Sequence, residues 1–90
     1  MTVVDDPDEE RYRALVDGAV AGSAFYHRRQ GRIVFLHTEV DPQFEGHGVG
    51  SRLAREALDE ARAKGLRVVP RCPFIARYIK EHPEYQALVD

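Results

Sequence analysis

The stretch "DPQFEGHGVGSRLAREALDEARAKG", Asp41 to Gly65, decides the fold of this 90-residue chain. Its second part repeats apolar residues at helical spacing with charged residues between them, which predicts one long amphipathic helix that stops at Gly65. The apolar positions are Val49, Leu53, Ala54, Ala57, Leu58 and Ala61. Three of the seven glycines, Gly46, Gly48 and Gly50, stand where this helix begins. The segment therefore predicts a glycine-rich turn that leads directly into a helix.

Upstream of this segment the apolar period changes to two, which is typical of strands. "RYRALVDGAVAGSAFYHRR" predicts two strands joined by Asp17-Gly18, a dipeptide that favours tight hairpin turns. Gly31 then turns the chain into "RIVFLHTEV", a third strand. The continuous apolar run Ile33 to Leu36 predicts that this strand is covered on both faces.

Strict alternation along the third strand assigns its side chains to two faces. Phe35, His37 and Glu39 are expected on one face, and Leu36, Thr38 and Val40 on the other. After the long helix, "LRVVP" predicts a short buried strand that Pro70 ends, and "FIARYIKEH" a shorter helix closed by Pro83. The order β-β-β-α-β-α predicts an α+β fold with a mixed sheet and a parallel crossover through the long helix.

Composition bounds the class of protein. The chain has 43% hydrophobic and 31% charged residues, enough for one small domain, and a net charge of −2 that argues against nucleic acid as a partner. No apolar run approaches a membrane span and no leader pattern opens the sequence, so the expected location is the cytoplasm. Residues 1–10, "MTVVDDPDEE", are expected to be a loose acidic lead-in to a folded domain over residues 11–90.

A strand, a glycine-rich turn and a helix N-terminus together form a candidate anion site, because the first helical turn carries unpaired N–H donors. The alternative is a turn that needs positive φ and close helix–sheet packing. Two phosphate-binding motifs are excluded: no lysine follows the glycines as in a Walker loop, and Ser51 stands where a dinucleotide fingerprint has its third glycine.

A third motif matches. Gln43-Phe44-Glu45-Gly46-His47-Gly48 fits Q/R-x-x-G-x-G/A, and the segment resembles the coenzyme A pyrophosphate signature of the GNAT N-acetyltransferase superfamily. "CPFIARYIKEHPEY" resembles the motif that follows it, with Cys72 in the place of an asparagine and Tyr78 in the place of a tyrosine. The chain also resembles sequences of a small single-domain subgroup of this superfamily in the blocks "FLHTEV", "GHGVGSRL", "CPF" and "HPEY". The resemblance covers about Gly18 to Val89.

The resemblance implies a minimal fold whose twisted sheet opens around the pantetheine arm of acetyl-coenzyme A, between the strand ending near Val40 and the strand Leu66 to Val69. It implies cofactor contacts from Val40, Gln43, Phe44, Glu45, Gly46, His47, Gly48, Val49, Gly50, Ser51, Cys72 and Tyr78. Larger members place helices between their first two strands, where this chain has the Asp17-Gly18 turn. The acceptor amine therefore stays open between protein, peptide and polyamine, and a non-catalytic coenzyme A-binding module or sensor is the alternative function.

Three residues are candidates for acetyl transfer, which needs a base, a polarising donor and an acid for the leaving thiolate. Glu39 stands where the superfamily often carries its base; otherwise it is a strand-end carboxylate. Tyr78 matches the superfamily's acid, or packs as a helix-face aromatic. Cys72 is either a nucleophile that takes the acetyl group or a small buried filler. His27, His37, His47 and His82 show no metal-ligand spacing, so no metal is expected.

Overall fold

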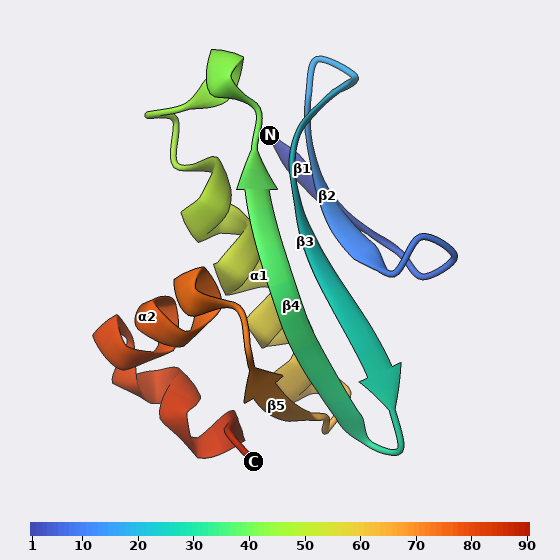
Figure 1. The fold of residues 1–90 in the computed structure, drawn as a ribbon, viewed down its shortest axis with the longest axis vertical. Helices are drawn as coiled ribbons and strands as arrows, with labels where there is room; N and C mark the ends of the chain where they lie inside the picture. The colour runs from blue at the N-terminus through green and yellow to red at the C-terminus, as the bar shows by residue number, and fades with distance from the viewer.

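The computed structural model describes the whole chain, Met1–Asp90, as one twisted sheet backed by helices (Figure 1). The strands lie in the order β1-β2-β3-β4-β5, antiparallel except for the parallel pair β4 and β5. They span β1 Thr2–Asp6, β2 Arg11–Val16, β3 Ala19–Arg29, β4 Arg32–Val40 and β5 Arg67–Pro70. The helices are α1 Val49–Ala63 and α2 Pro73–Glu81, with short 3-10 segments η1 Pro42–Phe44 and η2 Pro83–Leu88. The predicted α+β class with a mixed sheet is confirmed.

The two predicted turns are tight hairpins. Asp17 and Gly18 have φ of 50° and 81°, and Gln30 and Gly31 have φ of 48° and 78°. Two successive left-handed residues are what a two-residue hairpin requires to match the twist of its strands. Both turns therefore follow from local sequence, and they align β2, β3 and β4 side by side.

The long helix α1 buries the face that its periodicity predicts. Its buried residues are Val49, Gly50, Leu53, Ala54, Ala57, Leu58 and Ala61. The alanines let the helix lie close to the sheet, and each fully buried leucine or valine contributes about 1.5–3 kcal/mol. Figure 1 shows α1 crossing behind β4, so the opposite face of β3 and β4 has no helix over it. Neither helix has the length and apolar character that a membrane crossing needs.

The first strand corrects the prediction for residues 1–10. Thr2–Asp6 are not a loose lead-in but pair with β2 as an edge strand. Val3 packs against the core, and the Asp5 carboxylate accepts from the Tyr26 hydroxyl and lies 3.2 Å from the Arg28 guanidinium. Among the acids that indicated a solvated tail, Asp5 is thus held by partners more than twenty residues away.

A second correction concerns the faces of β4. Phe25 pairs with His37 and Tyr26 with Phe35, so Leu36 is an extra residue without a partner on β3. Such a bulge shifts the alternation of every side chain beyond it. Leu36 is 49% exposed, which contradicts the prediction that the apolar run is covered on both faces.

Because of this bulge, Phe35 does not share a face with Glu39 as predicted. Gly22 faces α1, since a Cβ added there would lie 2.9 Å from Val49, and Gly22 pairs with Val40. Val40 and Thr38 are therefore on the α1 side with the buried Phe35, whereas His37 and Glu39 are on the open side. The bulge thus puts Thr38 and Val40, in place of His37 and Glu39, on the same side of the sheet as Phe35.

Candidate functional site

The candidate site begins where β4 and β5 separate. The two strands pair from Arg32 and Arg67 as far as Phe35 and Pro70, and there the pairing ends. The last link is the N–H of Cys72, which donates to the Phe35 carbonyl at 2.8 Å. Beyond it β4 continues to Val40 without a strand partner on this side. The predicted opening between these two strands is therefore present.

Backbone groups of β4 line this opening. The Asp41 N–H donates to the Ala21 carbonyl at 2.8 Å, and groups that bond the antiparallel neighbour alternate along a strand. Glu39 thus directs its N–H and C=O toward β3. Thr38 and Val40 direct theirs toward the opening, where no strand receives them.

The glycine-rich loop and the first turn of α1 carry five free N–H donors. The N–H groups of Gly46, Gly48, Val49, Gly50 and Ser51 have no acceptor within the protein, and α1 has no side-chain cap. Gly46 and Gly48 have φ of 83° and 74°, a conformation that glycine adopts without strain. Successive N–H groups at such a turn, together with the helix dipole, form a concave anion-binding surface.

The three glycines meet two different needs. A Cβ on Gly46 or Gly48 would meet nothing within 4 Å, so their positive φ is what requires glycine. A Cβ on Gly50 would lie 2.9 Å from the Phe74 ring, so this glycine lets α2 approach α1. The positive φ expected for a purely structural turn is therefore present, whereas the close approach at Gly50 is between two helices and not between a helix and the sheet. The free N–H groups exist in addition.

A groove of about 240 Å³ joins this loop to the end of β4. It is lined by Val40, Phe44, Glu45, Gly46, Gly48, Val49, Gly50, Ser51 and Phe74. Eight of the predicted cofactor contacts thus lie together. Of the others, Gln43 lies outside the groove with its N–H bonded to the Asp41 carboxylate, and His47 borders the next hollow along α1.

Tyr78 lies between α1 and α2. It stacks on His82 with ring centres 3.8 Å apart and is 8% exposed. Its hydroxyl alone among the four tyrosines has no hydrogen bond within the protein, since Tyr12, Tyr26 and Tyr85 each donate to a carboxylate. Burial raises the pKa of Tyr78, so the phenol keeps its proton at neutral pH. It borders a hollow of about 250 Å³ that also contains Arg55, which has no ion-pair partner.

Cys72 stands at the N-cap of α2, as the motif predicts, but its side chain is only 2% exposed. Its Sγ lies 3.3 Å from the Thr38 hydroxyl, across the opening between the strands. Glu39, the next residue along β4, is on the opposite face with 57% of its side chain exposed, and its carboxylate is 4.0 Å from His37. The three catalytic candidates are therefore not one cluster: Cys72 and Tyr78 lie on the helix side, and Glu39 lies on the open side.

Sequence reasoning missed three residues of the site. Thr38 contacts Cys72, Phe74 covers Gly50, and Arg55 shares a hollow with Tyr78. Helical spacing carried a signal for Arg55, which lies one turn beyond Ser51 on the same helix face. No local pattern identifies Thr38, because its place depends on the bulge at Leu36.

Comparisons with known proteins agree with this architecture. Residues 11–88 match the family of GCN5-related N-acetyl-transferases. The human protein NATD1 is 41% identical over 58 residues, which is 63% of this chain and 51% of that protein, and mouse NATD1 is 41% identical over the same length, 53% of that protein. The chain thus spans about half the length of the curated relatives it matches.

Among solved structures, a GCN5-like protein from Staphylococcus aureus, determined by NMR, has a TM-score of 0.74 and 20% identity. The match covers 99% of this chain and 87% of that one. At this identity the likeness shows the fold alone, and the predicted small GNAT-like fold is confirmed.

Proposed function

The chain belongs to the family of GCN5-related N-acetyl-transferases, and we propose that it binds acetyl-coenzyme A and transfers the acetyl group to an amine. The observation that carries this proposal is the set of five unpaired N–H groups over Gly46 to Ser51, beside the opening between β4 and β5. A pyrophosphate needs such donors in a place that side chains leave free.

The pantetheine arm would extend from the loop along β4. Amide groups of the arm match the free backbone groups of Thr38 and Val40, in the way an added strand completes a sheet edge. This path leads from the groove beside Phe74 toward the gap that Thr38 and Cys72 border. The thioester would then lie at the edge of β4, within reach of both faces of the sheet.

In the transfer itself, the amine nitrogen attacks the thioester carbonyl and the C–S bond breaks. Glu39 accepts the proton that the amine loses, and Tyr78 donates a proton to the departing thiolate. The phenol of Tyr78 holds that proton at neutral pH, because its pKa is raised further above the ordinary value for tyrosine by burial. The burial of Cys72 favours direct transfer to the amine over a route through an acetylated cysteine.

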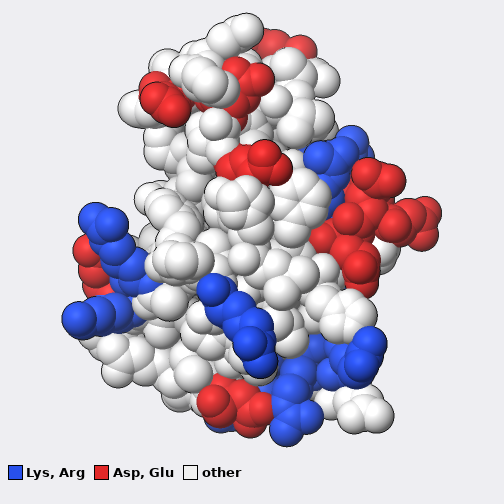
Figure 2. Space-filling view, in the orientation of Figure 1, with Lys and Arg blue, Asp and Glu red and all other residues white.

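The acceptor reaches Glu39 from the open face, because no helix covers β3 and β4 there. Figure 2 shows this face as largely uncharged in its middle, with basic and acidic side chains beside one another at its edges and some basic surface lower down. No additional pair of helices encloses the acceptor site on this face. This openness is the feature that favours the alternative, a coenzyme A-binding module without turnover.

A thermal-shift titration tests the proposal. Acetyl-coenzyme A and coenzyme A should stabilise the protein, by about 2.7 kcal/mol at a ligand concentration 100 times the dissociation constant, and ATP and NAD should have much weaker effects. A preference for NAD would contradict the proposal. Turnover against a panel of amines then separates the two functions, because binding without release of coenzyme A identifies the non-catalytic module.

A further inference from the structure

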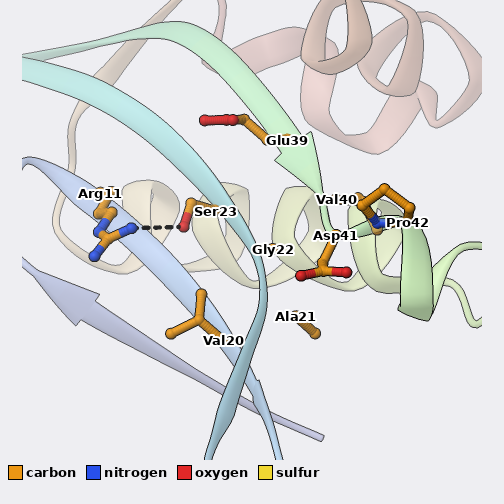
Figure 3. Close-up of a pocket in the computed structure, with 9 residues that line it drawn as sticks. All are labelled: Arg11, Val20, Ala21, Gly22, Ser23, Glu39, Val40, Asp41 and Pro42. Carbon is orange, nitrogen blue, oxygen red and sulfur yellow. Dashed lines mark hydrogen bonds between the residues drawn. The ribbon is translucent and has the colours of Figure 1, made fainter.

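The largest hollow of the molecule lies on the open face of the sheet and adjoins the coenzyme groove at Val40, which lines both. Its volume is about 350 Å³, within the range of sites for small molecules. Figure 3 shows its lining residues, which are Arg11, Val20, Ala21, Gly22, Ser23, Glu39, Val40, Asp41 and Pro42. The candidate base Glu39 therefore borders an open hollow on this face.

Two opposite charges border this hollow without pairing with each other. The Arg11 guanidinium donates to the Ser23 hydroxyl at 3.2 Å, and Ser23 is the register partner of Glu39. Arg11 and Glu39 are thus separated by one strand, yet no ion pair joins them. A ligand that carries one positive and one negative charge could pair with both groups. Its desolvation would therefore cost less free energy than that of an ion without a partner.

The position of Arg11 is restrained from several sides. Its guanidinium lies 5.8 Å from the centre of the Phe25 ring, and its Nε is buried without a hydrogen-bond partner. Its single carboxylate neighbour, Glu9, is 3.7 Å away and largely exposed. An ion pair of this kind contributes little to stability. The hollow therefore contains a positioned cation with unused capacity to bind an anion.

Opposite Arg11 the hollow is acidic. Glu39 has no guanidinium or ammonium partner, and His37 is 4.0 Å from it. Asp41 uses one carboxylate oxygen to accept the Gln43 N–H and borders the hollow as well. A cationic group would thus be stabilised at the β4 side and an anionic group at the β2 side.

We propose that this hollow binds the acceptor as a zwitterion, a free amino acid whose carboxylate pairs with Arg11 and whose amino group lies at Glu39. The inference rests on the proposed function, because it makes the amine at Glu39 the nucleophile of acetyl transfer. A polyamine fits less well, since its second ammonium would meet the Arg11 guanidinium. A lysine side chain within a protein would bring no carboxylate for that guanidinium.

Matched pairs of ligands test the proposal on the unmodified protein. Lysine and cadaverine differ only in the carboxylate, and lysinamide keeps the amines while replacing that group with an amide. Dissociation constants from NMR titrations with coenzyme A present avoid differences in amine reactivity. We expect lysine to bind about 10- to 100-fold more tightly than either partner, with shifts at the amides of Ser23 and Glu39. Equal or tighter binding of cadaverine would overturn the proposal.

Substitutions of Arg11, with a control at Arg29, provide a second test. Arg11→Leu should abolish the preference for lysine over cadaverine, and Arg11→Lys should restore part of it by keeping the charge. Arg29→Leu is the matched control, because Arg29 ends β3 and has no ion-pair partner, and it should keep the full preference. If Arg11→Leu does not fold, the ligand pairs on the unmodified protein still decide.

The two proposals fail separately. Absence of stabilisation by acetyl-coenzyme A contradicts the proposed function. Stabilisation by acetyl-coenzyme A without a preference for the carboxylate contradicts only the zwitterion at Arg11. A preference for lysine that Arg11→Leu leaves unchanged would also overturn it, because the carboxylate would then bind elsewhere.

Discussion

The hydroxyl of Thr38 lies 3.3 Å from the Sγ of Cys72 and so spans the gap where β4 and β5 have ceased to pair. The contact joins the strand that carries the candidate base to the N-cap of α2. It keeps the thiol at the position where the proposed path of the pantetheine arm ends.

Brief incubation with acetyl-coenzyme A should leave no acetyl thioester on Cys72, because the buried side chain favours direct transfer. Cys72→Ala should then keep most of the activity and all of the coenzyme affinity. Intact-mass spectrometry detects the adduct, which hydroxylamine removes. A trapped acetyl-cysteine that passes its acetyl group to an amine would reverse this choice of route.

Gly48→Glu should eliminate stabilisation by acetyl-coenzyme A, since it adds an anion beside the five free N–H groups. The variant also places a side chain at φ 74°, so Gly18→Glu is the control. Gly18 has φ 81° with open space around it, at the β2–β3 hairpin, and does not line the coenzyme groove. It should be destabilised to a similar extent and still bind. Loss of binding in both variants would show that backbone strain, and not the site, is responsible.

Glu39→Gln should lower the rate of transfer about 100- to 10,000-fold by removing the base, and leave coenzyme affinity unchanged. Asp8→Asn removes an exposed carboxylate elsewhere and should leave the rate unaltered. Tyr78→Phe should also slow transfer, because the thiolate then departs without a proton donor. Steady-state rates at saturating acetyl-coenzyme A measure these effects. Full activity of Glu39→Gln would show that another group or water accepts the proton.

Asp5→Ala should destabilise the fold by about 1–3 kcal/mol, since it leaves the Tyr26 hydroxyl and the Arg28 guanidinium without their shared acceptor. Asp8→Ala lies in the turn after β1 and should change stability by less than about 0.5 kcal/mol. Urea unfolding compares the two. Equal effects would mean that β1 contributes no more than a solvated tail.

Stability should fall in alkaline solution because of the buried tyrosines. Burial, followed by the hydrogen bond to Asp59, raises the pKa of Tyr85 from 10.0 to about 12, and burial raises the pKa of Tyr12 and Tyr26 as well. When folding raises the pKa of a tyrosine, the contribution of that group to stability is complete below the unfolded pKa. It is lost as the pH rises through the folded pKa. For Tyr85 the loss therefore lies between about pH 10 and 12.

Tyr85→Phe should show a shallower decline of unfolding free energy over that range. The substitution also removes the hydrogen bond to Asp59 and should cost about 0.5–1.5 kcal/mol at neutral pH. Urea unfolding at pH 8, 10 and 11 separates the two effects. An unchanged slope would mean that the Tyr85 phenol contributes nothing to the alkaline loss.

The elements that followed from sequence are those whose signals are local. The period of Leu53 to Ala61 predicts α1, and Asp17-Gly18 adopts the left-handed pair that a two-residue hairpin requires. The glycine-rich turn before the helix likewise depends only on its own backbone angles. A helix face, a turn and a helix N-terminus are all determined within a few residues of chain, so a single sequence is enough to find them.

Tertiary structure decided what depends on register and on distant partners. β1 is held in place because its Asp5 carboxylate accepts from the Tyr26 hydroxyl and pairs with the Arg28 guanidinium. Composition alone does not reveal these partners. Leu36 is a bulge because the register of β3 and β4 leaves it without a partner on β3. The resulting shift placed Glu39 on the open face and Thr38 beside Cys72. Strand register is a property of two segments together, so the period of one strand predicts alternation and cannot predict where that alternation breaks.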